Sequence, residues 1–180
     1  VEEAQKLLIE ASKVQKLRQG LVWGKDPRHF EGHAQMLQSV LQAIPDMKLF
    51  STSTQPMFQH PRMRWMGHQT RDAWRKLLQE SKFLVGLGDP LLGPSAIDAI
   101  TAGCMFINPT YTKPKKGRMN QHPYAADHVG GPYVCNYRFG DSAALLKCIQ
   151  QALQTDLKPL SLPEFEREAY FKRVAQIFNL

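Results

Sequence analysis

The chain has 180 residues, of which 43% are hydrophobic and 22% charged, as in a globular domain with one core. It contains no run of about eighteen apolar residues, so no segment of it is predicted to span a membrane. The net charge of +7 favours an anionic partner. Nucleic acid is not expected, because no nucleic-acid motif is present and no interleaved aromatic residues accompany the main basic cluster, Lys113, Lys115, Lys116 and Arg118.

The first third of the chain alternates between predicted helices and strands. Apolar residues at helical spacing predict a helix over residues 2–18 that Gly20 ends, and we interpret residues 1–20 as an interlobe or linker segment. Short apolar runs predict strands at 21–23, 47–50 and 63–66. A helix is predicted over 33–43, and a second over 71–81 with Thr70 as its N-cap.

The remaining elements continue this pattern. Residues 83–88 form an apolar run typical of a strand covered on both faces. We expect a loop at 89–94, a helix over 95–102 closed by Gly103, and a strand at 105–107 that Asn108-Pro109 ends. A long loop over 111–132, a strand at 133–137 and helices over 142–153 and 164–178 complete the prediction. The alternation predicts an α/β fold, a Rossmann-like parallel sheet with helices on both faces over residues 21–180.

Three cysteines, Cys104, Cys135 and Cys148, are too few and too scattered to predict a disulfide framework or a zinc site. Cys104 follows Gly103 within an apolar run, which predicts a buried thiol. The chain does not begin with Met, and we interpret it as a piece of a longer polypeptide.

The main candidate site is the glycine- and proline-rich loop after the strand at 83–88. In parallel sheets ligands lie beyond the carboxyl ends of the strands, so the loops after Trp23, Gly88 and Ile107 are expected to share one edge. Glycines admit close approach of the backbone to a ligand, and the start of the following helix offers unpaired N–H groups to a phosphate. The alternative is a tight turn with Ser95 as a helix cap. The expected ligand-binding residues here are Gly86, Gly88, Gly93, Pro94, Ser95 and, for a ribose, Asp98.

Two further features are candidates for the same edge. Lys25, directly after the first strand, is predicted to place its ammonium against a diphosphate, although an exposed lysine is the alternative. Gln121, His122 and Tyr124 lie in the long loop and are candidates for lining a cleft near a sugar. With only His128 beside His122, no metal site is predicted.

Four short motifs follow one another along the chain: Trp23-Gly24-Lys25, Gly86-Leu87-Gly88, Gly93-Pro94 followed by Asp98, and Gln121-His122-Pro123-Tyr124. Over about residues 21–178 they resemble the donor-binding domain of the N-acetylglucosaminyltransferase V enzymes, glycosyltransferase family 18. The resemblance implies the C-terminal lobe of a GT-B enzyme, with donor and acceptor meeting between two lobes.

By this resemblance the enzyme would transfer N-acetylglucosamine from UDP-GlcNAc to a mannose of a glycoprotein N-glycan, with inversion and without a metal or other cofactor. The catalytic base would come from the N-terminal lobe of the same polypeptide, which this sequence lacks, so the isolated piece should be inactive. The family also implies a Golgi membrane protein with this domain on the lumenal side.

The sequence departs from the family pattern in three ways. Leu92 replaces an acidic residue, Asp98 replaces a glutamate and the long loop is shorter. Two alternatives therefore stay open: a non-catalytic transferase lobe or interaction module, and a GT-B transferase that uses another nucleotide sugar, such as a guanosine diphosphate sugar.

Overall fold

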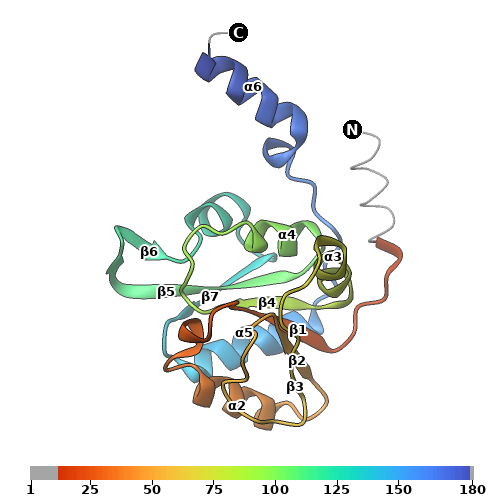
Figure 1. Cartoon of the computed structure of the whole chain (residues 1–180), viewed down its shortest axis with the longest axis vertical. Coiled ribbons are helices and arrows are strands. Elements are labelled where there is room, and N and C mark those ends of the chain that lie inside the picture. The colour runs from red at the N-terminus through yellow and green to blue at the C-terminus, as the bar shows by residue number, and fades with distance from the viewer. Residues whose placement is uncertain (1–11, 179–180) are drawn as a thin grey trace.

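The computed structural model describes residues 12–178, in which one seven-stranded sheet lies between two layers of helices (Figure 1). The strand order is β3-β2-β1-β4-β5, all parallel. β7 pairs with β5 in parallel, and β6 pairs antiparallel with the second half of β5. This confirms the predicted α/β class. The strands are β1 (Gln19–Trp23), β2 (Lys48–Ser51), β3 (Met63–Trp65), β4 (Phe83–Gly86), β5 (Met105–Lys115), β6 (Arg118–Asn120) and β7 (Val134–Arg138).

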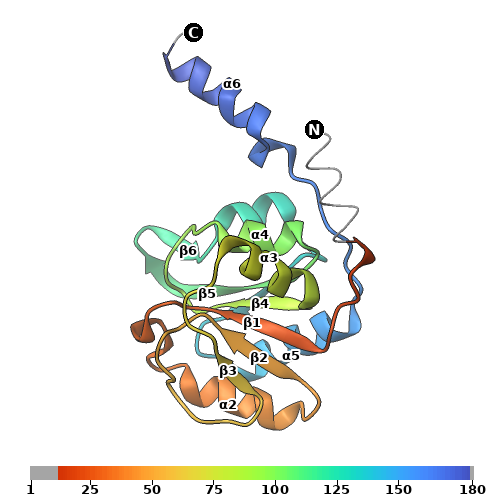
Figure 2. The ribbon, with the colours of Figure 1, turned by 45° about the vertical axis from the view of Figure 1, so that its right-hand side comes forward.

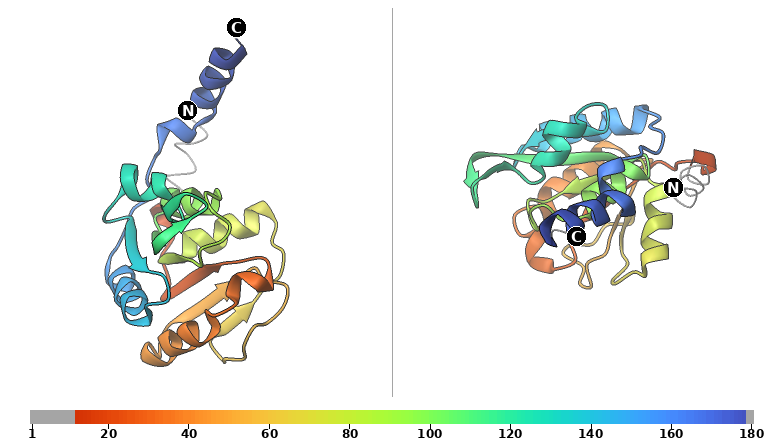
Figure 3. Two further views of the ribbon diagram at one scale, coloured as in Figure 1. Left: turned by 90° about the vertical axis from the view of Figure 1, so that its left-hand side faces the viewer. Right: turned by 90° about the horizontal axis from the view of Figure 1, so that it is seen from above.

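The helices divide between the two faces of the sheet (Figures 1 and 2). One face is covered by α2 (Ala34–Ala43) and α5 (Ser142–Gln154), and the other by α3 (Arg71–Glu80), α4 (Ser95–Thr101) and the π-helical turn η2 (Ala125–Val129). Short 3-10 turns form η1 (Pro27–Phe30) and η3 (Pro163–Phe165). The last helix, α6 (Arg167–Phe178), projects away from the sheet and has no buried residue (Figure 3).

Each face of the sheet has its own apolar core, because successive side chains of a strand point to opposite faces. Leu21 and Trp23 of β1 join the core beneath α3 and α4, whereas Val22 joins the core beneath α2 and α5. In β4, Leu84 faces the first of these cores, and Phe83 faces the second. This double burial explains why the strands appear in the sequence as uninterrupted apolar runs.

Two predicted helix ends are confirmed. The Thr70 side chain accepts a hydrogen bond from the Ala73 N–H and so caps α3. Gly103 follows α4 in the left-handed conformation with φ 75°, as expected after a helix C-terminus.

The predicted N-terminal helix is wrong in its last turn, and residues 2–11 lie outside the described part of the chain. Residues 14–18 are not helical, and Gly20 lies inside β1. Tertiary hydrogen bonds hold this segment extended: the Lys16 ammonium donates to the carbonyls of Ser81 (2.7 Å) and Ala102 (2.9 Å) at the ends of α3 and α4. Burial lowers the pKa of Lys16, and these carbonyls replace the water that its charge loses.

The predicted long loop over 111–132 is also wrong. β5 continues through Pro109 to Lys115 and turns back into β6, so Asn108-Pro109 does not end the strand. The Asn108 side chain donates to the Asn136 side chain (3.0 Å), which continues the pairing with β7. The turn consists of Lys116 and Gly117, both with positive φ, as tight two-residue hairpins require.

Cys135 of β7 and Cys148 of α5 form a disulfide, which corrects the expectation drawn from their scatter in the sequence. The fold brings their Cα atoms to 5.8 Å because α5 packs directly on β7. Cys104 is a buried free thiol, as predicted, and burial raises its pKa.

Replacement of both Cys135 and Cys148 by alanine should lower the free energy of unfolding by about 3 kcal/mol, because the closed loop is close to the length for which chain entropy predicts that value. Urea unfolding of the wild-type chain and of the double variant, each with and without reductant, measures this. Reductant should destabilise the wild type alone. An equal response of both proteins would contradict the assignment of the bond.

Candidate functional site

The carboxyl ends of β1 and β4 lie side by side at one edge of the sheet, next to the first half of β5. Trp23 pairs with Gly86 and Val85 pairs with Ile107, so the segments that follow these residues emerge next to one another. This confirms the expected shared edge for the segments after Trp23 and Gly88, whereas the loop expected after Ile107 is wrong, because β5 continues to Lys115. What occupies it is the loop after β4, residues 87–94, flanked by η1 on one side and by the β5–β6 hairpin on the other.

A buried amide holds the loop after β4 in place. The Gly88 N–H donates to Gln121 Oε1 (3.0 Å), and Gln121 Nε2 donates to the Pro90 carbonyl (2.9 Å). The Gln121 carbonyl accepts from the Leu92 N–H (3.1 Å). Gln121 is fully buried, and its bond with the Gly88 N–H is buried as well, so loss of the amide would leave that N–H unpaired at a cost of about 1–3 kcal/mol.

Three glycines, Gly86 at the end of β4 and Gly88 and Gly93 in the loop, are required mainly by the protein's own side chains. A Cβ at Gly86 would lie 2.1 Å from Gln121 Oε1, and one at Gly93 would lie 2.3 Å from the Trp23 ring. A Cβ at Gly88 would lie 2.9 Å from the Phe139 ring. The close approach that the glycines permit is therefore to Gln121, Trp23 and Phe139, whereas contact of this backbone with a ligand remains a prediction.

Strands β5 and β7 support the same loop with polar side chains. The Tyr111 hydroxyl and the Lys115 ammonium both donate to the Gly88 carbonyl at 3.1 Å, and Lys115 also forms an ion pair with Asp89. The Tyr137 hydroxyl donates to the Gly86 carbonyl (2.9 Å). Burial, with the nearby charge of Asp89, raises the pKa of Tyr111 to about 12, so this hydroxyl remains a hydrogen-bond donor.

A cavity of about 710 Å³ lies between η1, the loop after β4 and the hairpin; we call it the hairpin cavity. Its lining carries three cations, one carboxylate and a histidine whose Nδ1 is buried without a hydrogen-bond partner among residues 12–178. Its volume lies within the range of small-molecule sites. It is lined by Arg28, His29, Asp89, Pro90, Leu91, Lys116 and Arg118.

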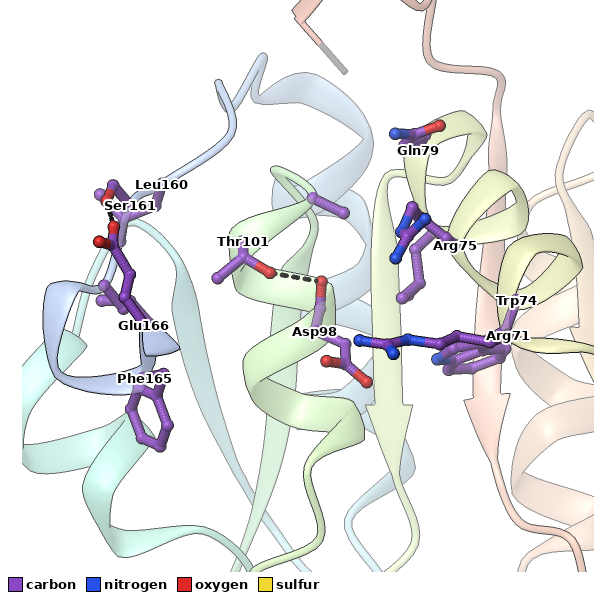
Figure 4. A pocket seen from close by; sticks show the side chains of 13 residues that line it. Arg71, Trp74, Arg75, Gln79, Asp98, Thr101, Leu160, Ser161, Phe165 and Glu166 are labelled. Carbon is purple, nitrogen blue, oxygen red and sulfur yellow. Dashed lines mark hydrogen bonds between the residues drawn. The ribbon is translucent and has the colours of Figure 1, made fainter. Parts of the chain in front are cut away.

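A second cavity, of about 270 Å³, lies between α3, α4 and the segment that precedes α6; we call it the helix cavity (Figure 4). Asp98 of α4 points across it toward the Arg71 guanidinium of α3, beside Trp74 (Figure 4). Phe165 and Glu166 form the opposite wall. Desolvation raises the pKa of the Asp98 carboxyl, although the positive charge of Arg71 acts in the other direction.

The predicted site residues do not gather in one cavity. Asp98 lines the helix cavity, and Lys25, Gly93, Pro94 and Ser95 line neither of the two. Lys25 is exposed just beyond β1. Pro94 is the N-cap of α4, and the alternative of a Ser95 cap is wrong, because no side-chain cap bond forms there.

The motif formed by Gln121, His122 and Tyr124 supports the edge from beneath, and the structure does not place it on an open cleft. His122 is buried, its N–H donates to the Asn108 side chain (3.1 Å), and burial lowers its pKa. Tyr124 stacks on His128 at 4.9 Å and meets the Phe165 ring at 5.0 Å. The motif thus ties the hairpin to η2 and to the C-terminal segment.

Sequence reasoning missed most of the residues that line the two cavities. Lys116 and Arg118 belong to a basic cluster of the sequence, and Lys-Gly lacks the Asn-Gly or Asp-Gly pattern that indicates a two-residue hairpin. No sequence signal distinguishes the other charged residues from surface ones; these are Arg28, His29, Arg71, Arg75 and Glu166.

Two negative observations apply to residues 12–178 alone. Nowhere in that range do three or more His, Cys, Asp or Glu side chains come together in a group that could hold a metal ion. None of its helices has both the length and the apolar character needed to cross a bilayer.

Residues 1–179 match the sequence model of the family described as Glycosyltransferase family 18. Alpha-1,6-mannosylglycoprotein 6-beta-N-acetylglucosaminyltransferase A of Homo sapiens is 30% identical over 112 residues, which cover 54% of this chain and 15% of that protein. The Caenorhabditis elegans alpha-1,6-mannosylglycoprotein 6-beta-N-acetylglucosaminyltransferase is 25% identical over 179 residues, 88% of this chain and 26% of that protein. The matches thus span about a quarter or less of these relatives.

Solved structures with a similar fold are larger than this chain. The glycotransferase of kitacinnamycin aligns with a TM-score of 0.54 at 12% identity, covering 91% of this chain and 38% of that one. S. aureus MnaA, solved with UDP, aligns with a TM-score of 0.55 at 10% identity, covering 96% of this chain and 49% of that one. At such identities the similarity concerns the fold, and this chain corresponds to half or less of each molecule.

Gly86→Ala and Gln121→Ala should each lower the free energy of unfolding by about 1–3 kcal/mol, the first by overpacking and the second by leaving buried groups unpaired. Because the new Cβ and the Gln121 amide compete for one space, the double variant should lose less than the sum, with a coupling of about 1 kcal/mol. Urea unfolding measures all four proteins. Gln154→Ala, an exposed amide at the end of α5, is the control and should be near neutral. Simple additivity would contradict the packing account.

Proposed function

The chain belongs to glycosyltransferase family 18, and we propose that it is the donor-binding lobe of an N-acetylglucosaminyltransferase. In this proposal the complete enzyme transfers N-acetylglucosamine from UDP-GlcNAc to a mannose of a protein-linked N-glycan. The observation that carries the proposal is the family match over residues 1–179. The curated relatives named as 6-beta-N-acetylglucosaminyltransferases support the donor and the acceptor class.

The proposed donor position is the carboxyl edge of the sheet, where parallel α/β folds bind nucleotides. Asp98 would accept hydrogen bonds from the ribose hydroxyls, because an ionised carboxylate is an acceptor with two oxygens. The N–H groups at Ser95 and the ammonium of Lys25 would contact the diphosphate. The surroundings of Asp98, with the Trp74 ring and the Arg71 guanidinium beside it, fit a nucleoside better than they fit a bare sugar.

The chemistry assigned to this lobe is binding and charge stabilisation. An inverting displacement, without a metal, needs a base that deprotonates the acceptor hydroxyl, and we assign that base to the N-terminal lobe of the complete polypeptide. The present lobe would orient the donor and stabilise the negative charge that grows on the departing UDP. On its own it would bind UDP without catalysing transfer.

We place the domain in the Golgi lumen as part of the same proposal. The disulfide between Cys135 and Cys148 supports an oxidising compartment, since such bonds persist in secretory proteins and are rare in the cytosol. The membrane anchor that a Golgi location requires would belong to the complete polypeptide.

Isothermal titration calorimetry with UDP tests the site. Asp98→Asn and Lys25→Ala should each weaken binding about tenfold, because each removes one charge-assisted contact. Glu168→Gln on the projecting helix α6 is the control; it removes an exposed carboxylate far from the sheet and should bind as the wild type does. Binding that is unchanged in both site variants would end these assignments.

Competition identifies the nucleotide. UDP should displace a bound uridine nucleotide at lower concentration than GDP, whereas the reverse order would favour a transferase with a guanosine diphosphate sugar. A chain that binds neither nucleotide would be better described as an interaction module.

The affinity for uridine should fall as the pH is lowered toward the pKa of Asp98, which desolvation raises above its usual 3.8. Below that pKa the carboxyl is protonated and loses acceptor capacity, so the ribose contact weakens. Uridine lacks phosphate groups, and its binding therefore isolates this contact. The pH dependence should disappear in Asp98→Asn; a dependence that persists there would assign it to another group.

A further inference from the structure

The hairpin cavity has a surplus of positive charge. Of its charged residues, Asp89 is paired with Lys115, and Arg28 is paired with Asp26. Lys116 and Arg118 have no ion-pair partner within residues 12–178. A concave surface lined by unneutralised cations concentrates anions, so this cavity favours binding of a negatively charged group.

The register of the hairpin places Arg118 on the side that faces the loop after β4. Lys115 and Arg118 are directly opposed across the two strands, and opposed residues project to the same side of a hairpin. The Lys115 side chain reaches Gly88 and Asp89 of that loop, so the Arg118 side chain extends on the loop side as well. Like charges in this relation destabilise a hairpin unless an anion lies between them. Asp89 forms an ion pair with Lys115, and no carboxylate within residues 12–178 forms one with Arg118.

The two-residue turn of the hairpin also contains an unfavourable feature. Lys116 adopts a positive φ of 48°, which costs a non-glycine residue about 1 kcal/mol or more and is usually left to Asn, Asp or Gly. The sequence thus retains a lysine where local conformation disfavours it, and that lysine lines the cavity. Local strain of this kind is tolerated where a side chain serves a ligand.

The proposed function identifies the anion. The cavity shares Asp89, Pro90 and Leu91 with the loop that leads into α4, where the donor is placed. The start of α4 offers the equivalent of about half a positive charge, which leaves most of the charge of a diphosphate unneutralised. Side-chain cations must then neutralise most of the diphosphate charge. Lys25 contributes a single positive charge, so further cations are needed.

We propose that Lys116 and Arg118 of the β5–β6 hairpin bind the diphosphate of the nucleotide sugar from the side of the hairpin cavity, opposite Lys25 and the start of α4. This inference rests on the proposed function and adds two residues that face the donor from the hairpin side. Arg28 and His29 complete the opposite wall of the cavity. The hairpin would thus act on the phosphates alone, and the nucleoside would be bound elsewhere.

Calorimetric titration of the whole chain with UDP and with uridine separates the two contributions. Lys116→Gln and Arg118→Gln should each weaken UDP binding about tenfold and leave uridine binding within about twofold of the wild type. Arg118→Lys keeps the charge and should recover part of the lost affinity. The control is Lys147→Gln, which removes the same charge from an exposed position on α5 and should leave UDP binding unchanged.

The outcomes distinguish the inference from the proposed function. UDP binding that is equal in wild type and in both hairpin variants overturns the inference and leaves the donor lobe intact. Loss of uridine binding in the hairpin variants, or a loss in Lys147→Gln equal to theirs, also overturns it, because the effect would then be structural or due to net charge. A wild-type chain that binds neither UDP nor uridine overturns the proposed function and the inference together.

Discussion

The form of the carboxyl edge depends on one buried side chain, Gln121. Its amide fixes the first half of a loop that has no regular structure of its own, accepting from Gly88 and donating to Pro90. The space it occupies exists because residue 86 has no side chain. Since Gln121 directly follows β6, its amide links the loop after β4 to the hairpin.

The charges of this edge are arranged around that loop and the hairpin. Lys115 is used internally, bound to the Gly88 carbonyl and to Asp89, so it is not available to a ligand. Lys116 and Arg118, farther along the hairpin, have no such internal ion pair within residues 12–178. Asp98, by contrast, lies on the α3 side of α4 with Arg71. A ligand that spans both regions would need one end that is anionic and one end that offers hydroxyl groups and an apolar ring, as nucleoside diphosphates do.

The candidate site was partly predictable. The glycines and Asp98 are candidates from the sequence alone, because backbone approach and carboxylate chemistry depend on residue type, which the sequence states directly. Their partners were not recognisable. Gln121 lies far along the chain from Gly86, and the side chains that face Asp98 come from a separate helix, so no spacing rule connects them. Lys116 and Arg118 became site residues only when the predicted loop proved to be a hairpin.

Local sequence patterns are enough to predict the α/β class, the strands of the buried sheet and the helix ends at Thr70 and Gly103, because each depends on local periodicity or on a single backbone conformation. Three features depend on the folded chain: the extended course of residues 14–18, the disulfide between Cys135 and Cys148, and the continuation of β5 through Pro109. In each of these a contact with a distant segment, worth more than the local preference, selects the conformation.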